Sequence, residues 1–179
     1  MMAELFIAHS VSKLEQMTGH IENCLDRLTE DQIWRRGSEA ENSVGNLVLH
    51  LCGNLGQWIG HYVAGREDSR NRPAEFALDA GLAKAGLKAK LRAAVDRAKA
   101  DISALTAGRL AESVVTADRP MQMLTVVYQV VGHFQQHSGQ IMFATKLMTQ
   151  GDLGFYVPIR TTEPAPCASA MPTSTALKP

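Results

Sequence analysis

The most specific chemical feature of this 179-residue chain is a pair of histidines four residues apart, His133 and His137. In a helix this spacing places two side chains on one face, with about 5–6 Å between their Cβ atoms, so both imidazoles can bind one metal ion. The apolar neighbours Val130, Phe134 and Ile141 indicate partial burial, and buried polar groups are costly unless they are partnered. The alternative is a chance spacing of two histidines that only pack or lie at the surface.

His50 is the candidate third ligand, because it lies within an apolar helical pattern between Leu49 and Leu51. Asn54 falls one turn later on nearly the same face and could hydrogen-bond a ligand, a bound water or a substrate. Gln140 flanks the histidine pair and could likewise contact a ligand or a substrate. The alternatives are a satisfied core histidine for His50, a buried interhelical hydrogen bond for Asn54 and a solvated helix face for Gln140.

The expected donor set is three neutral imidazoles without a carboxylate. Phe134 stands where an HExxH metalloprotease carries its general-base Glu, and the Glu-x-x-His motifs of di-iron bundles are missing. Three imidazoles leave coordination positions open for water or substrate, which is typical of a catalytic site rather than a closed structural one. Imidazole suits Zn²⁺ or Ni²⁺, but the sequence does not select the metal. His61, eleven residues beyond His50, lies about 16 Å further along the helix and cannot share this ion.

Four segments with helical periodicity are long enough to position these residues. We expect helices over residues 4–28, 42–64, 81–105 and 120–150. We expect no strands, and a loop at 106–119. The long connection at 65–80 can return along the molecule, so that the second and third helices run parallel. The sequence therefore predicts an all-α four-helix bundle of up-down-down-up order.

Composition limits the domain organisation and the partners. Lys+Arg and Asp+Glu are both 18, and this balance excludes the electrostatic footprint of a nucleic-acid binder and argues against an anionic membrane surface. No apolar run reaches the ~18 residues of a membrane span. We expect one domain over residues 1–160 and a disordered tail rich in Pro, Ser, Thr and Ala over 161–179.

Compartment is indicated by the cysteines and the N-terminus. The three cysteines form no CxxC pair and their count is odd, which suggests reduced thiols. The first eleven residues have no basic stretch followed by a long apolar run, so they do not read as a signal peptide. We therefore expect a cytoplasmic protein.

Three stretches together resemble the DinB/YfiT-like superfamily of bacterial metal-dependent four-helix bundles: NSVGNLVLHLCGNLGQWI, GREDSRNRPAEF and HFQQHSGQIMFATKLM. The resemblance covers most of residues 4–157 and is to an uncharacterised branch. It implies a metal site on His50, His133 and His137, and frequent homodimers. Characterised members are thiol-dependent transferases or isomerases that use bacillithiol, mycothiol or glutathione, which implies a low-molecular-weight thiol and a small-molecule substrate.

Three interpretations follow. In the first, the chain is a metal-dependent enzyme, with thiol transfer to a small electrophile as the favoured reaction and metal-assisted hydrolysis as the second. In the second, it is a non-catalytic metal-binding or dimeric interaction protein whose metal stabilises the bundle or an interface. In the third, it is a helical protein without metal, in which the histidines only pack. An open pocket with coordinated water would favour an enzyme, and an inaccessible site with four protein ligands would favour a non-catalytic role.

Overall fold

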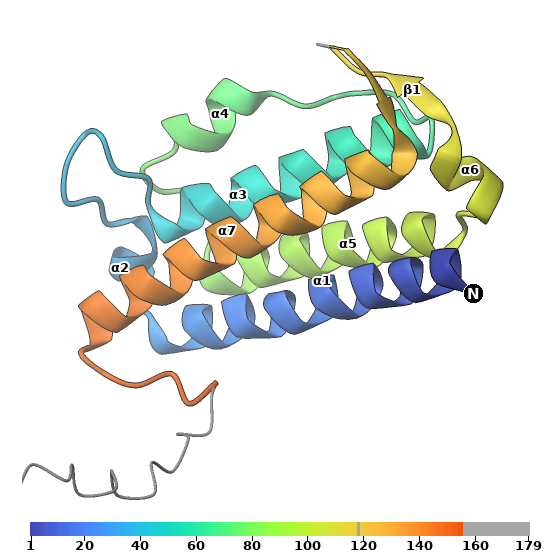
Figure 1. Cartoon of the computed structure of the whole chain (residues 1–179). Helices are drawn as coiled ribbons and strands as arrows, with labels where there is room; N and C mark the ends of the chain where they lie inside the picture. The colour runs from blue at the N-terminus through green and yellow to red at the C-terminus, as the bar shows by residue number, and fades with distance from the viewer. Residues whose placement is uncertain (118, 156–179) are drawn as a thin grey trace, which may run out of the picture.

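The computed structural model describes residues 1–117 and 119–155, so the expected tail at 161–179 lies outside the described residues. Four long helical segments lie side by side and are joined by shorter elements (Figure 1). The elements in chain order are α1 (Met2–Arg27), α2 (Glu30–Trp34), α3 (Val44–Leu55), the π-helix η1 (Gly56–Val63), α4 (Arg72–Ala77), α5 (Lys84–Ser103), α6 (Ala107–Ala111), β1 (Ser113–Val115), β2 (Pro120–Gln122) and α7 (Met123–Thr149).

The long helices form the expected all-α bundle. Helix α1 packs against α5 and α7, and α3 packs against the same two helices, so α1 and α3 lie diagonally opposite. The segment between η1 and α5 returns along the bundle, and α3 and α5 therefore run in the same direction while α1 and α7 run in the other (Figure 1). The up-down-down-up order is confirmed.

Apolar stripes from all four helices meet in one core. Leu14 and Ile21 of α1, Leu91 of α5, and Phe134 and Ile141 of α7 are at most 1% exposed. Leu14 and Ile21, like Phe134 and Ile141, are seven residues apart, and this spacing of two turns keeps one face of a helix toward its neighbours. Burying these apolar side chains removes their surface from water, and this is the main driving force for assembly of the bundle.

Two details of the chain differ from expectation. A two-stranded hairpin pairs Ser113 with Gln122 and Val115 with Pro120, so α7 begins at Met123 and not at Pro120. Strands of three residues are too short to display an alternating pattern, and Pro120 can begin a strand as well as a helix. The second helix is also not uniform, because its α-helical turns end at Leu55 and wider π-helical turns continue to Val63.

Helix α3 has a well-defined start that fixes the register of its buried face. The Ser43 hydroxyl accepts a hydrogen bond from the Asn46 N–H at 3.1 Å, and the Asn46 side-chain oxygen accepts one from the Ser43 N–H at 3.2 Å. This reciprocal pair satisfies donors that the first turn of a helix leaves free. The pair therefore fixes the start of α3, and His50 lies one turn after Asn46 on this helix.

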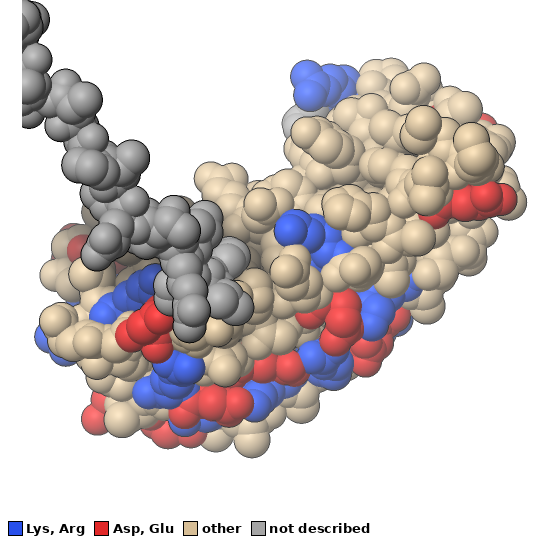
Figure 2. All heavy atoms as spheres, turned by 60° about the horizontal axis from the view of Figure 1, so that its bottom comes forward, with Lys and Arg blue, Asp and Glu red and all other residues tan. Residues whose placement is uncertain are grey.

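The seam between α1 and α5 is held by ion pairs. Arg92 of α5 contacts Glu15 and Glu22 of α1, and Lys99 also contacts Glu15. Figure 2 shows these charges as a band of alternating sign over α1 and α5, while much of the remaining face is uncharged. Within the described ranges, no helix is both long and apolar enough to cross a membrane.

Candidate metal centre

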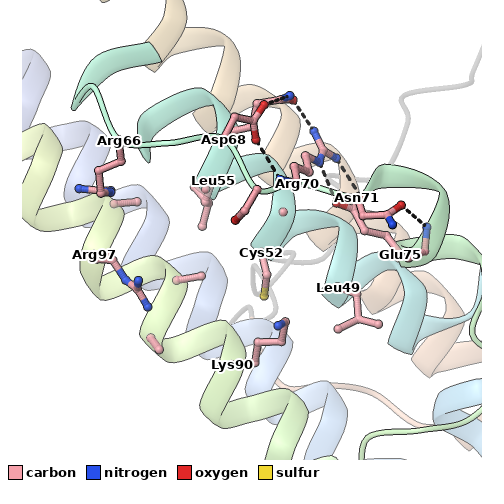
Figure 3. Close-up of a pocket in the computed structure, with 18 of the residues that line it drawn as sticks. Leu49, Cys52, Leu55, Arg66, Asp68, Arg70, Asn71, Glu75, Lys90 and Arg97 are labelled. Atoms are coloured by element: carbon pink, nitrogen blue, oxygen red, sulfur yellow. Dashed lines mark hydrogen bonds and ion pairs between the residues drawn. The ribbon is translucent and has the colours of Figure 1, made fainter. Parts of the chain in front are cut away.

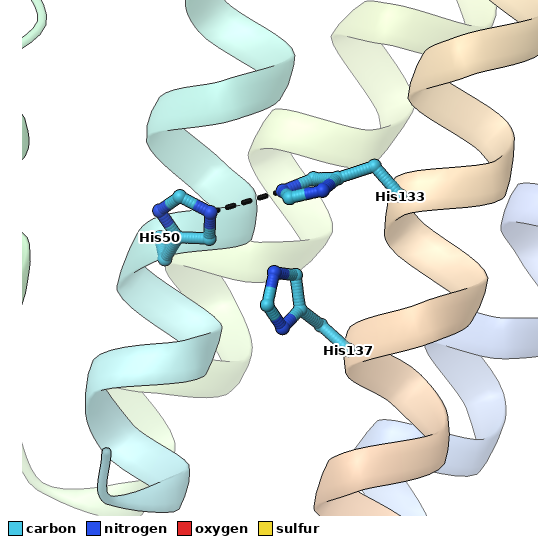
Figure 4. A group of neighbouring side chains, drawn as sticks. All are labelled: His50, His133 and His137. Carbon is cyan, nitrogen blue, oxygen red and sulfur yellow. Dashed lines mark hydrogen bonds between the residues drawn. The ribbon is translucent and has the colours of Figure 1, made fainter. Parts of the chain in front are cut away.

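Three histidines converge between α3 and α7 (Figure 4). His50 comes from α3, and His133 and His137 come from successive turns of α7. The Nε2 atoms of His50 and His133 lie 2.9 Å apart. One ring nitrogen from each of the three residues lies within 4.8 Å of the others, so this group could hold a metal ion.

Burial makes this cluster costly without a shared partner. His50 is 5% exposed and His133 and His137 are partly buried. The neighbouring side chains on α7 are apolar, with Val130 and Phe134 at most 2% exposed. Removing polar groups from water in this way costs free energy unless they are hydrogen-bonded or bound to a metal.

The structure adds a residue that the sequence analysis did not identify, Glu75. Its carboxylate oxygen Oε2 lies 2.9 Å from the Nδ1 atom of His50, and the side chain is nearly fully buried. Glu75 also receives two hydrogen bonds from Arg70, from Nε to Oε1 at 2.7 Å and from Nη2 to Oε2 at 2.9 Å. A carboxylate held on both sides by charged or polar donors is fixed in position.

Glu75 reaches the site because the connection between η1 and α5 contains the short helix α4. The Asn71 side chain accepts a hydrogen bond from the Ala74 N–H and caps this helix. The Asn46 side-chain amide of α3 donates to the carbonyl oxygens of Glu75 and Leu78, at 3.1 and 2.8 Å, and so fastens α4 to α3. An Asn followed by Arg-Pro is a helix-start signal, and it was the available sequence sign of this element.

Gly53 allows the carboxylate to approach α3. A Cβ atom at this position would overlap Glu75 Oε1 and would lie 3.1 Å from the Nε atom of Arg70. A larger residue would therefore push Glu75 away from His50. The contact between Glu75 and His50 therefore requires glycine at position 53.

The hydrogen bonds determine which nitrogen of His50 faces the other rings. A carboxylate only accepts hydrogen bonds, so the Nδ1 atom of His50 must donate to Glu75. The Nε2 atom of His50 then carries the lone pair, and it lies 2.9 Å from the Nε2 atom of His133. Arg70 Nη2 also lies 3.1 Å from His50 Nδ1, but two donors cannot bond each other, so its hydrogen bond goes to Glu75.

The imidazoles of His50 and His133 are neutral near pH 7. Burial lowers the pKa of His50, although the hydrogen bond and charge of Glu75 act in the opposite direction. Burial, followed by the nearby His137 and His50 side chains, lowers the pKa of His133 to about 4. Neutral imidazole is the form that binds metal, and the site therefore maintains these two donors in a binding-competent state.

Gln140 and Asn54 lie in different parts of the site. The Gln140 Oε1 atom is 2.6 Å from the Nδ1 atom of His137, so this residue orients His137. Asn54 is 8% exposed and lines a pocket of about 520 Å³ next to His50 and His133. The other residues lining this pocket are Gln57, Trp58, Arg70, Arg72, Gln129, Val130 and Gln136.

His61 is far from the cluster, as its spacing predicts. Its Nδ1 atom lies 2.6 Å from the Arg66 carbonyl oxygen at the end of the π-helix. His20, on α1, instead stacks on Phe155 with ring centroids 4.2 Å apart. Three of the six histidines therefore lie together in one site.

The arrangement of four long helices with a histidine cluster between the second and the fourth defines a helical bundle with a candidate metal centre. The chain belongs to the family of proteins of unknown function DUF1572, whose pattern matches residues 1–158. This assignment confirms the expected uncharacterised family, and the DinB-like fold is supported by one of the solved structures that follow. Among curated proteins, none matches the chain.

Two solved structures are similar in fold. A conserved protein from Enterococcus faecalis has a TM-score of 0.67 and 18% sequence identity, over 80% of this chain and 97% of that one. The DinB-like protein YjoA from Bacillus subtilis has a TM-score of 0.63 and 13% identity, over 83% of this chain and 97% of that one. At these identities the likeness concerns the fold alone.

Proposed function

We propose that this protein is a metal-dependent enzyme that holds one divalent cation on His50, His133 and His137. The observation that carries the proposal is the convergence of three ring nitrogens within 4.8 Å of one another at the edge of an open pocket. A structural metal site is normally closed by a fourth protein ligand. Among the described residues no fourth His, Cys, Asp or Glu joins this group.

The donor set fits a divalent ion. Two imidazole nitrogens that bind one ion at about 2.0–2.1 Å lie roughly 3 Å apart at right-angled coordination and about 3.4 Å apart in tetrahedral coordination. The His50 and His133 Nε2 atoms are 2.9 Å apart, so a small adjustment of the rings brings them to either geometry. The hydrogen bond from His50 to Glu75 is the kind of outer contact that orients a ligating histidine and increases its basicity. Imidazole donors favour Zn²⁺ or Ni²⁺.

The reaction we favour is thiol-dependent transfer to a small electrophile. A bound divalent cation lowers the pKa of a thiol or a water molecule next to it. None of the described residues that line the pocket beside His50 is Asp or Glu, so this part of the chain places no carboxylate base in that pocket. A thiol has an intrinsic pKa of about 8.5 and water one of 15.7, so the thiol needs less help to lose its proton.

The pocket residues would bind and orient the two reactants. Asn54, Gln129 and Gln136 present amide groups, and Trp58 and Val130 present apolar surface. In the reaction, the thiol sulfur forms a bond to the electrophilic carbon, the leaving group departs with its bonding electrons, and the thiol proton passes to solvent. A low-molecular-weight thiol and a small organic substrate both fit the size of this pocket.

A homodimer is the proposed assembly. Leu124, Tyr128, Phe143 and Leu147 of α7 are 42–71% exposed, and they lie on the outer face of the helix that carries two of the metal-binding histidines. Exposed apolar residues gathered on one helix face are typical of an interaction surface. A cytoplasmic location is part of the same proposal, since Cys24 and Cys52 are buried free thiols.

A thiol-transfer assay tests the function. Metal-loaded protein would be incubated with a small alkyl halide or epoxide and with bacillithiol, mycothiol or glutathione, and thiol consumption would be followed. We expect a metal-dependent acceleration with at least one thiol that His133→Ala abolishes. Metal-dependent ester hydrolysis without thiol transfer would instead establish the second candidate reaction, a hydrolase. Bound metal with neither activity would support the non-catalytic interpretation.

A further inference from the structure

A second pocket lies on another face of α3, next to the metal centre. Its volume is about 570 Å³, and it is bounded by α3, α5 and the segment that leads into α4. Figure 3 shows Lys90 and Arg97 on α5 across this pocket from Cys52 and Leu55 on α3. Arg70 and Glu75, which hold His50 in place, form part of its wall.

The pocket is open because small residues line the two facing helices. Gly56 of η1, and Ala93, Ala94 and Ala98 of α5, contribute little or no side-chain volume to it, whereas the space beside Gly53 is filled by Glu75. A Cβ atom placed on Gly56 would meet no other atom within 4 Å. Together with Leu49 and Leu55 these residues give the pocket an apolar floor.

The cations of helix α5 lie on two sides of the helix and differ in whether they are paired. Lys88, Arg92 and Lys99 form ion pairs with acidic residues of α1. Lys90 and Arg97, which line the pocket, have no ion partner in the part of the chain that the structure describes. Lys88, Arg92 and Lys99 are neutralised by α1, whereas the charge of Lys90 and Arg97 is available to a ligand.

The other cations of the pocket are paired, whereas its carboxylates Glu67 and Asp68 form no ion pair in the described part of the chain. Arg66 pairs with Asp101, and Arg70 pairs with Glu75. The Asp68 carboxylate accepts hydrogen bonds from the Gln57 amide and the Arg70 backbone N–H. Lys90 and Arg97 are therefore the cations in this pocket that lack a counter-charge.

We propose that this pocket binds a small amphipathic anion, a molecule with a phosphate or carboxylate headgroup and an apolar body. The headgroup would contact Lys90 and Arg97, which are suited to such oxyanions. The apolar body would lie over the glycine and alanine floor. The volume lies within the range of metabolite-sized sites, and binding here requires no metal.

The ligand is held without a covalent bond. Cys52 lies in the pocket wall, but burial raises the pKa of its thiol to about 12. A thiol in this state is a poor nucleophile at neutral pH. An occupant of the pocket would lie against Arg70 and Glu75. Only the Glu75 side chain would then separate it from His50.

Amide chemical shifts of the full-length protein, measured by NMR during ligand titration, test the proposal. The probes are phenyl phosphate, benzoate, inorganic phosphate and the neutral match phenol. We expect saturable shifts at Gly53, Gly56 and residues 90–98 with phenyl phosphate or benzoate, and weaker binding of inorganic phosphate and phenol. The tighter of the two aromatic anions identifies the headgroup.

Two double variants separate this pocket from general charge effects. Lys90→Gln with Arg97→Gln should weaken binding by about tenfold or more. Lys13→Gln with Arg35→Gln removes the same charge from cations outside the pocket and should leave binding unchanged. The proposal is overturned if shifts appear around Arg72 and residues 129–137 instead, if neither anion gives saturable shifts, or if both double variants behave alike.

Discussion

Glu75 Oε2 lies 2.9 Å from His50 Nδ1, although the two residues are 25 positions apart and come from different helices. This contact fixes the tautomer of His50 and directs its Nε2 lone pair at His133. Replacing Glu75 with Gln removes the charge while a side chain of similar size remains. We expect Zn²⁺ affinity, measured by competition with a chromogenic chelator, to fall about 10–100-fold. Affinity equal to that of the native protein would show that the carboxylate has no part in metal binding.

Gly53 and Gly56 form a matched pair of sites on consecutive turns. Gly53→Ala should displace Glu75 from His50, because the new methyl group occupies the place of the carboxylate. We expect it to weaken metal binding as Glu75→Gln does, and to lower the free energy of unfolding by about 1–3 kcal/mol through overpacking. Gly56→Ala meets open space and should leave metal affinity unchanged while stabilising the helix by about 0.5–1 kcal/mol. Urea unfolding and chelator competition on both variants provide the comparison.

Much of the fold was accessible from the sequence because it depends on periodicity. The stripes that contain Leu14, Ile21 and Phe134 repeat over several turns, and long repeats define helices reliably. The direction of α5 followed from the length of the connection before it. The hairpin was missed for the opposite reason, since strands as short as Ser113–Val115 contain too few residues to show a period.

Only part of the site could be predicted from the sequence. His133 and His137 share one helix, so their spacing alone brings them together. Glu75 reaches His50 through the docking of α4 on Asn46, and this is a tertiary contact that no local pattern encodes. The separate roles of Gln140, which orients His137, and Asn54, which lines the pocket, likewise depend on how α3 and α7 pack.

Acidification should destabilise the metal-free protein. In the folded state the pKa of His133 is about 4, against 6.5 for an unperturbed histidine. Between these values the unfolded chain binds more protons than the folded protein, so the free energy of unfolding falls as the pH drops from about 6.5 to 4. His133→Gln should reduce this slope. Urea unfolding of chelator-treated protein at several pH values measures it, and equal slopes in both proteins would contradict the assigned pKa.

The outer face of α7 should mediate self-association. Tyr128 is 71% exposed, and Tyr128→Glu would place a charge that is costly to bury in a dimer interface. We expect the native protein to sediment as a dimer and this variant as a 19.5 kDa monomer. Val115→Glu, at a similarly exposed apolar residue of the hairpin, serves as the control and should remain dimeric. A native protein that sediments as a monomer at micromolar concentration would refute the proposed assembly.

The three-histidine centre is tested most directly by the metal content of tag-free protein, measured by elemental mass spectrometry. We expect about one equivalent of Zn²⁺, Ni²⁺ or a similar divalent ion in the native protein. His61→Ala should retain it, since this ring contacts the Arg66 carbonyl oxygen and not the cluster, whereas His133→Ala should lose it. Native protein that takes up no metal after incubation with Zn²⁺ or Ni²⁺, or a His133→Ala variant that retains a full equivalent, would contradict the site.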